Sequence, residues 1–230
     1  MKTRDIIFLF ILILFFLPFF ISPAVYRTYN AFNSSHGFIM SFFKFALLAT
    51  LGEVIGLRIG KGVYTEKGFG YIPRAFVWGL LGMGIYGAMI IFSKGTPAFL
   101  ESIGIQGASS AMQGPVSLKK IGVAFSISLA MNTVFAPVFM TIHKITDAHI
   151  IKNEGSIRKF FRPIDMGASL KALNWDIQWN FVFKKTIPFF WIPAHTITFL
   201  LPETFRVLFA SLLGIVLGVI LAVAAIKSRR

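Results

Sequence analysis

Long apolar segments separated by short polar connections dominate the pattern of this chain. Each segment is close to the roughly 20 residues that an α-helix needs to cross the hydrocarbon core of a bilayer. The pattern therefore predicts an all-α fold, a polytopic transmembrane helix bundle with about six hydrophobic segments. We place these segments at Ile6–Ser22, Gly37–Leu57, Ala75–Ser93, Ile121–Ile142, Phe181–Leu201 and Val207–Ile226.

The first and fifth segments are the least regular. Ile6–Ser22 has the features of a transmembrane helix and of a signal-peptide core, with Ser22 and Ala24 forming a small-x-small cleavage pattern. We favour an uncleaved helix because the apolar run is long, and we treat residues 1–29 separately from a helical membrane domain over residues 30–230. The fifth segment should begin near Thr186 and be broken at its prolines, since it contains Lys184, Lys185, Pro188, Pro193 and His195.

Composition agrees with a membrane protein and narrows its chemistry. Hydrophobic residues make up 56% of the chain, charged residues 14%, and cysteine is absent. The lack of cysteine excludes disulfides and thiolate metal sites. The net charge of +14 comes from basic residues between apolar segments and at the chain ends. Membrane topology explains this arrangement better than nucleic-acid binding does.

The basic residues also predict an orientation, because cytoplasmic loops carry an excess of Lys and Arg. With six spans, one side holds most of them, and this side should be the cytoplasm, or a matrix in an organelle, with both termini there. That side would carry Lys2, Arg4, Arg58, Lys61, Lys67, Arg74, Lys144, Lys152, Arg158, Lys159, Arg162, Lys171, Lys184, Lys185, Lys227, Arg229 and Arg230. The other side would carry Arg27, Lys94, Lys119, Lys120 and Arg206.

Two connections are longer than the rest. The outer one, Lys94–Lys120, contains a glycine- and serine-bearing stretch, Gly104–Gly114, that predicts a loop or a short re-entrant turn. The inner one, Lys144–Lys185, contains an amphipathic pattern over Met166–Gln178 that Asp165 is placed to cap. We expect this amphipathic stretch to form an interfacial helix on the inner leaflet.

Small residues recur at four-residue spacing on two of the predicted helices. Four residues is close to one helical turn, so such residues share a face along which another helix can approach closely. The alternative is that they merely fill apolar helices. The glycines concerned are Gly52, Gly56 and Gly60 in the second segment and Gly214 and Gly218 in the last.

Polar residues inside the apolar segments are the candidate functional residues, because such groups are costly in hydrocarbon. Glu53 is the leading candidate; its alternative is a structural ion pair with Arg58 or another basic residue. Lys44 lies about half a turn round the same helix from Glu53 and is a candidate to face a water-filled lumen.

Asn132 and His195 are candidates from later segments. Asn132 precedes Pro137, whose missing N–H frees a backbone carbonyl that polar groups must satisfy, so a structural kink is the favoured interpretation there. His195 is expected either to line a pore or to hydrogen-bond a neighbouring helix. Pro188, Pro193 and Pro202 are expected to kink the chain. No persuasive enzyme motif occurs, and we expect no cofactor, no metal site and no nucleic-acid partner.

Several short motifs, in order, resemble the Mpv-seventeen/peroxisomal-membrane-protein (22-kilodalton) family. Gly52-Glu53 matches a Gly-Asp pair in that family's first helix, with Leu57 in place of a glutamine. Ala136-Pro137 matches an Ala-Pro pair in its third helix, where Met131 replaces an acid. Two further matches are Glu154-Gly155 and the stretch Leu201–Arg206.

The resemblance covers about Ser41–Val223 and implies a four-helix membrane core with channel-like conductance of small solutes. We expect a bacterial cytoplasmic membrane, because the chain lacks a Ser/Arg-rich amphipathic presequence. The leading hypothesis is a small-solute pore or transporter in the lipid bilayer, with Glu53, Asn132, His195 and Arg206 facing the bundle interior. The rival is a non-transporting scaffold whose glycine faces mediate packing or homo-oligomerisation.

Overall fold

The computed structural model describes residues 2–227, over which all regular secondary structure is helical. Arg229 and Arg230, which contribute to the predicted orientation, lie outside the described residues. The chain forms two compact units, Met1–Met40 and Ser41–Arg230.

The first unit contains helices α1, Thr3–Ile21, and α2, Pro23–Ser35. The chain breaks between them at Ser22, whose backbone is extended and whose hydroxyl accepts a hydrogen bond from the Val25 amide at 3.4 Å. Pro23 follows at the first helical position, where its missing N–H costs nothing. A serine cap followed by proline therefore ends the first apolar helix and starts the next.

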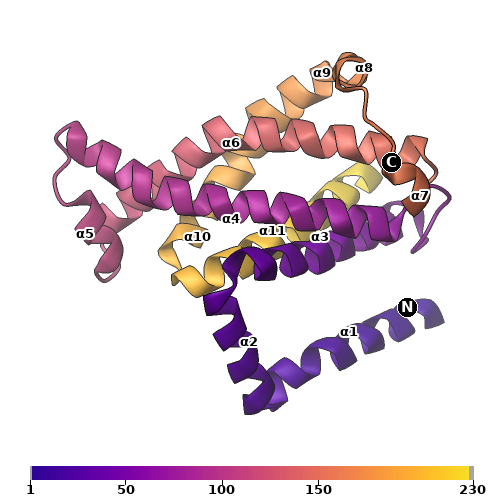
Figure 1. The fold of residues 1–230 in the computed structure, drawn as a ribbon, viewed down its shortest axis with the longest axis horizontal. Coiled ribbons are helices and arrows are strands. Elements are labelled where there is room, and N and C mark those ends of the chain that lie inside the picture. Colours follow the sequence, from indigo (N-terminus) through magenta and orange to yellow (C-terminus); the bar gives the residue numbers. More distant parts are fainter. Residues whose placement is uncertain (1, 228–230) are drawn as a thin grey trace. The chain divides into compact units, whose positions relative to one another are not determined.

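The second unit is a bundle of long helices that run back and forth (Figure 1). The helix α3 enters it from the first unit, and short helices connect the longer ones. The bounds are α3 Gly37–Lys61, α4 Tyr71–Ser102, α5 Ala108–Gln113, α6 Leu118–Lys152, α7 Ile157–Phe160, α8 Met166–Ala172, α9 Trp175–Ile177, the π-helix η1 Gln178–Trp191, α10 Ile192–Leu200 and α11 Glu203–Lys227.

Five helices in the described chain are long and apolar enough to cross a membrane: α1, α3, α4, α6 and residues Glu203–Val223 of α11. These are the helices of a multi-pass membrane protein. The prediction of six such segments is not confirmed, because the fifth, Phe181–Leu201, is divided between η1 and α10. Its prolines lie within η1, at Pro188, and in the first turn of α10, at Pro193.

The predicted interfacial helix over Met166–Gln178 is not confirmed either. Asp165 does cap its start, since the carboxylate accepts a hydrogen bond from the Ala168 amide at 2.9 Å. The helix α8 nevertheless stops at Ala172. Asn174 then caps a new helix by accepting from the Ile177 amide at 3.0 Å. A second capping residue eight positions after the start therefore divides the stretch.

The two remaining prolines occupy different positions relative to the helices. Pro137 lies inside α6 without ending it, whereas Pro202 stands between α10 and α11. The Gly104–Gly114 stretch, expected to be a loop or a re-entrant turn, contains the short helix α5, whose Ala108 is fully buried.

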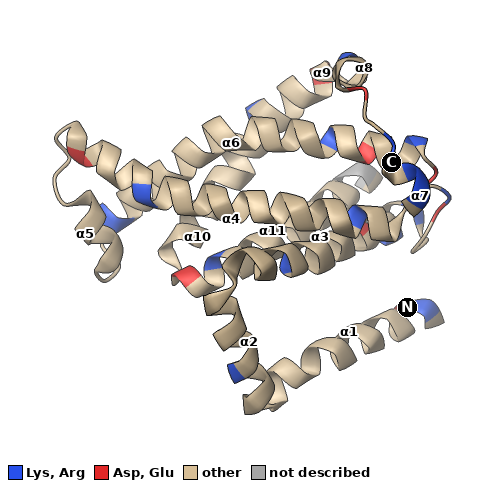
Figure 2. Ribbon diagram, viewed as in Figure 1, with Lys and Arg blue, Asp and Glu red and all other residues tan. Residues whose placement is uncertain are grey.

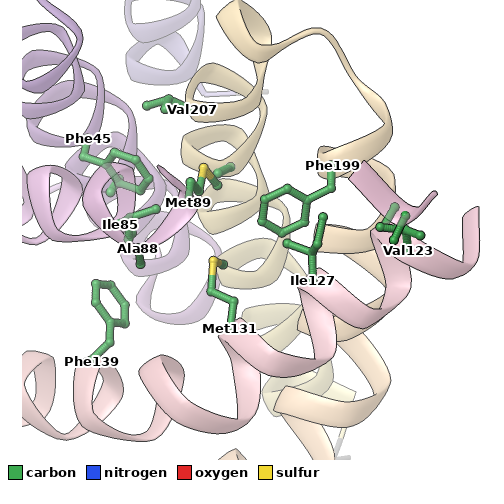
Figure 3. Packing of buried hydrophobic residues seen from close by; sticks show 14 residues of the cluster. Phe45, Ile85, Ala88, Met89, Val123, Ile127, Met131, Phe139, Phe199 and Val207 are labelled. Carbon is green, nitrogen blue, oxygen red and sulfur yellow. The ribbon is translucent and has the colours of Figure 1, made fainter. Parts of the chain in front are cut away.

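Glycines on α4 allow α3 to pack closely against it. A Cβ atom at Gly82 would lie 2.5 Å from Cβ of Phe45, and one at Gly79 would overlap the ring of Phe42. Figure 3 shows Phe45 beside Ile85, Ala88 and Met89 in the core that α3, α4, α6, α10 and α11 share. Two glycines thus provide the space that two phenylalanines fill.

The predicted glycine faces also meet within the chain. A Cβ atom at Gly52 would lie 3.0 Å from Cα of Ile215, and one at Gly218 would lie 3.4 Å from the Gly52 carbonyl oxygen. A Cβ atom at Gly56 would be 3.8 Å from the Gly218 carbonyl oxygen. Cβ atoms at Gly60 and Gly214 would have no neighbour within 4 Å. Close approach of α3 and α11 therefore uses three of the five predicted glycines.

Candidate functional site

Glu53 lies on the face of α3 that contacts α4 and α6, where three side chains surround its carboxylate. Its Oε2 forms an ion pair with Nη1 of Arg74 at 2.5 Å. Its Oε1 accepts a hydrogen bond from Nε1 of Trp78 at 2.8 Å and lies 3.4 Å from Nε2 of His143. The alternative of a structural ion pair is therefore realised with Arg74. Arg58 instead donates to the backbone oxygen of Gly62.

Arg74 lies in the first turn of α4, and its side chain is fixed by contacts with the loop that precedes this helix. Its side chain is only 9% exposed, its Nε donates to the Phe69 carbonyl at 2.5 Å, and its guanidinium lies 4.7 Å from the centre of the Phe69 ring. Nη1 also forms an ion pair with Oδ1 of Asp147. One guanidinium thus joins carboxylates from α3 and α6, while its Nε donates to the backbone.

The helix α6 contributes His143 and Asp147, which lie one turn apart on the same face. The imidazole ring of His143 also packs against the indole of Trp78, with ring centroids 4.4 Å apart. We call Glu53, Arg74, Trp78, His143 and Asp147 the charge network. It joins α3, α4 and α6.

The charge network contains more negative than positive charge when His143 is neutral. Two carboxylates then face one guanidinium. Buried ions are tolerated when they are paired, and removing one partner of such a pair is strongly destabilising. A protonated His143 would bring the network to neutrality.

Helix length places the charge network near one membrane boundary. The 35 residues of α6 span about 52 Å, so about 11 Å extend beyond each side of a 30 Å hydrocarbon core if the helix is centred. Asp147 lies about 8 Å from the end of α6 and His143 about 14 Å from it. Figure 2 shows charged residues of the Ser41–Arg230 unit concentrated towards its helix ends and loops.

A second polar cluster, without charged side chains, lies between α6 and α10. Ser128 donates to the Ile192 carbonyl at 2.7 Å, and Asn132 Nδ2 donates to the Ser128 carbonyl at 2.8 Å. The side chain of Asn132 is also within 3.1 Å of Nδ1 of His195. Asn132 and His195 are both buried. The structure therefore brings these two predicted residues together as hydrogen-bonding partners between helices.

The two clusters share one side of α6. His143 follows Asn132 by eleven residues, which is about 20° more than three full turns. Phe135 and Phe139 lie between them along the helix, with ring centroids 5.5 Å apart. A polar face interrupted by phenylalanines thus runs from mid-membrane depth to the boundary.

Lys44 and Arg206 belong to neither cluster. Lys44 is buried on α3, two and a half turns before Glu53. Arg206 lies in the first turn of α11 and donates to the carbonyls of Leu201 at 3.1 Å and Phe199 at 3.3 Å. Its guanidinium therefore provides hydrogen-bond donors to carbonyl groups at the C-terminal end of α10.

The loop before α4 and the loop after α6 are joined by glycines and by Glu154. Gly70 and Gly155 both have positive φ, and a Cβ atom at Gly155 would lie 2.7 Å from Cα of Gly70. Glu154 forms ion pairs with Lys159 at 2.8 Å and Lys67 at 3.8 Å. These lysines hold the pKa of the Glu154 carboxyl below its ordinary value, with the Lys159 hydrogen bond the larger cause.

The sequence does not reveal Arg74, Trp78 and His143 as neighbours of Glu53, or Asp147 as a partner of Arg74. The sequence pattern places Arg74 in a basic inner loop, whereas it lies in the first turn of α4. The available signal was the four-residue spacing of His143 and Asp147 on a helix face. Over the described residues, no group of three or more His, Cys, Asp or Glu side chains is arranged to hold a metal ion.

Comparison of the chain with protein-family models, curated proteins and solved structures finds no significant match.

Proposed function

We propose that this protein moves small solutes across a lipid bilayer, as a pore or transporter, with the charge network as its polar centre. The observation that carries the proposal is the placement of two partly buried carboxylates, a buried guanidinium and a partly buried imidazole between three helices of membrane-spanning length. Charged groups within membrane helices generally mark ion or substrate pathways.

Stability alone is a poor reason for such a network. Replacing a buried ion pair with well-packed apolar residues is often neutral or stabilising by about 1–4 kcal/mol. Stability by itself therefore does not require charged residues at Glu53, Arg74 and Asp147. A role in passing polar solutes accounts for the presence of the charges.

The rival is a non-transporting scaffold in which the glycine faces mediate packing or homo-oligomerisation and the polar residues merely pair. Gly52, Gly56 and Gly218 instead contact each other's helices within one chain. These three glycines therefore account for packing of α3 on α11 within one chain and give no support to homo-oligomerisation.

The resemblance to the Mpv-seventeen/peroxisomal-membrane-protein family supports the same proposal through Glu53, which matches that family's acid. Relationship to that family, a bacterial cytoplasmic membrane and cytoplasmic termini are parts of the proposal. The chain would cross the bilayer a sixth time through η1 and α10, which together provide 23 consecutive helical residues, 14 in η1 and 9 in α10.

The proposal is tested by measuring the swelling of proteoliposomes in solutions of graded neutral and charged solutes. Wild-type protein should admit small solutes faster than protein-free liposomes, and Glu53→Gln should change the rate or the charge preference. Glu154→Gln is the matched control, since it removes a carboxylate from an exposed loop and should behave as wild type. Swelling of wild-type liposomes at the protein-free rate would contradict the proposal.

A further inference from the structure

We propose that the charge network is a binding site for one exchangeable proton, which His143 takes up from water and returns to it. On uptake an N–H bond forms on the imidazole while a hydronium ion becomes water, so no other reactant is needed. The proposed link to transport rests on the proposed function, whereas proton binding itself does not.

The first argument is the charge balance. Oxygen atoms of Glu53 and Asp147 both contact Nη1 of Arg74, so one guanidinium faces two carboxylates. The groups in contact with His143 are Glu53 from α3 and Trp78 from α4, and Arg74 and Asp147 complete the network beyond them. With a neutral imidazole this set carries one uncompensated negative charge. One proton on the imidazole brings the set to neutrality.

The second argument is the position of His143 among the histidines. The chain has four histidines, and within the described residues His143 is the one whose ring lies within ion-pair distance of a carboxylate, 3.4 Å from Glu53. His195 contacts Asn132 and the ring of Trp191, and His149 contacts the Phe160 carbonyl and Asn153. Only at His143 does a carboxylate stabilise an added positive charge directly.

The third argument is access to water. The side chains of His143, Glu53 and Asp147 are 17%, 21% and 22% exposed, respectively. His143 and Asp147 also lie within about two and a half turns of the end of α6. This partial exposure and position place the network beside one membrane surface, in contrast to the enclosed Asn132 side chain.

Proton exchange would affect solute movement by changing how the helices that the charge network joins pack on each other. Proton uptake neutralises the charge network and strengthens the contact between Glu53 on α3 and His143 on α6. Release leaves a net negative charge that attracts cations and loosens this contact. The network is thus placed to couple a proton to the packing of α3 against α6.

The proton site is tested by nitrogen NMR of histidine-labelled full-length protein in nanodiscs, with the His143 signal assigned by its loss in His143→Gln. In wild type, the signal should change from imidazolium to imidazole as the pH is raised. At one pH where wild type shows both forms, the ratio of imidazolium to imidazole at His143 should be lower in Glu53→Gln and in Asp147→Asn. Two variants guard against the failure of either to fold.

Glu154→Gln is the control and should leave the His143 ratio unchanged. A His143 signal that does not respond to pH, or the same ratio in wild type and in a folded Glu53→Gln or Asp147→Asn variant, would overturn the proton site. Solute flux is measured on the same preparations. A responsive His143 without any wild-type flux would support the proton site and contradict the transport function.

Discussion

Arg74 is the residue on which the balance of the charge network depends, because its guanidinium contacts Glu53 and Asp147 at once. Arg74→Met should destabilise the protein by about 3–5 kcal/mol, since it leaves two carboxylates without their cation. Thermal unfolding in detergent micelles measures the loss.

Lys67→Met is the matched control, because Lys67 pairs with Glu154 at an exposed position. It should change the stability by no more than about 0.5 kcal/mol. An equally small effect of Arg74→Met would mean that the charge network is not formed.

Glu154 provides a prediction about pH. The nearby lysines lower the pKa of its carboxyl in the folded protein, with Lys159 contributing most. A lowered folded-state pKa stabilises the fold above the ordinary pKa of about 4.3, and this contribution is lost as the pH falls through the lowered value. Wild type should therefore unfold at a higher temperature than Glu154→Gln at neutral pH.

The same comparison at about pH 3 should show a smaller difference, because both proteins then approach a neutral side chain at this position. Unfolding temperatures recorded by intrinsic fluorescence across this range provide the measurement. A difference that grows as the pH falls would contradict the ion pairs of Glu154.

Sequence alone identified Glu53, since a carboxylate inside an apolar segment is an exception that can be seen without a structure. It did not identify Arg74, 21 residues later, because that pairing requires α3 and α4 to lie side by side. Asn132 and His195 were found separately for the same reason. Polar residues in apolar segments can be found from sequence, whereas their partners depend on helix packing.

At the scale of elements, the contact of α3 with α4 depends on glycines that accept phenylalanine rings. Gly82→Ala should lower stability by about 1–3 kcal/mol, because its Cβ would overlap Phe45. This loss opposes a gain of about 1 kcal/mol in helix propensity. Chemical unfolding in mild detergent measures the net effect.

Gly95→Ala is the matched control on the same helix, where an added Cβ would have no neighbour within 4 Å. It should keep or raise the stability. If both alanine variants were equally stable, the close packing of Phe45 on α4 would be wrong.

Apolar length predicted α1, α3, α4, α6 and α11, because each is a single long helix. It failed at Phe181–Leu201, where a π-helix changes to an α-helix at Trp191 and Ile192. It also failed over Met166–Gln178, where Asn174 starts a second helix within one amphipathic pattern. Hydrophobic periodicity does not distinguish a continuous helix from one that is recapped or rewound.

At the scale of the whole molecule, the Ser41–Arg230 unit combines an apolar core with polar residues aligned along α6. The glycine faces of α3 and α11 pack on each other within this unit. Sequence predicted that these faces pack, but whether they meet within one chain or between chains depends on topology. The proposed solute path passes the charge network, at His143 near the membrane boundary, whereas Asn132 at mid-membrane depth is enclosed between α6 and α10.

Cysteine labelling tests this path most directly, because the natural chain contains no cysteine. A single cysteine at His143 would lie in the charge network on the polar side of α6, and cysteines at Val134 and Val138 on its exposed apolar side. A charged methanethiosulfonate reagent is added to proteoliposomes, and labelling and solute flux are followed together. We predict that His143→Cys reacts and that its reaction blocks flux, while Val134→Cys and Val138→Cys do neither. Absence of labelling at His143→Cys in liposomes that conduct solutes would contradict a path through the charge network.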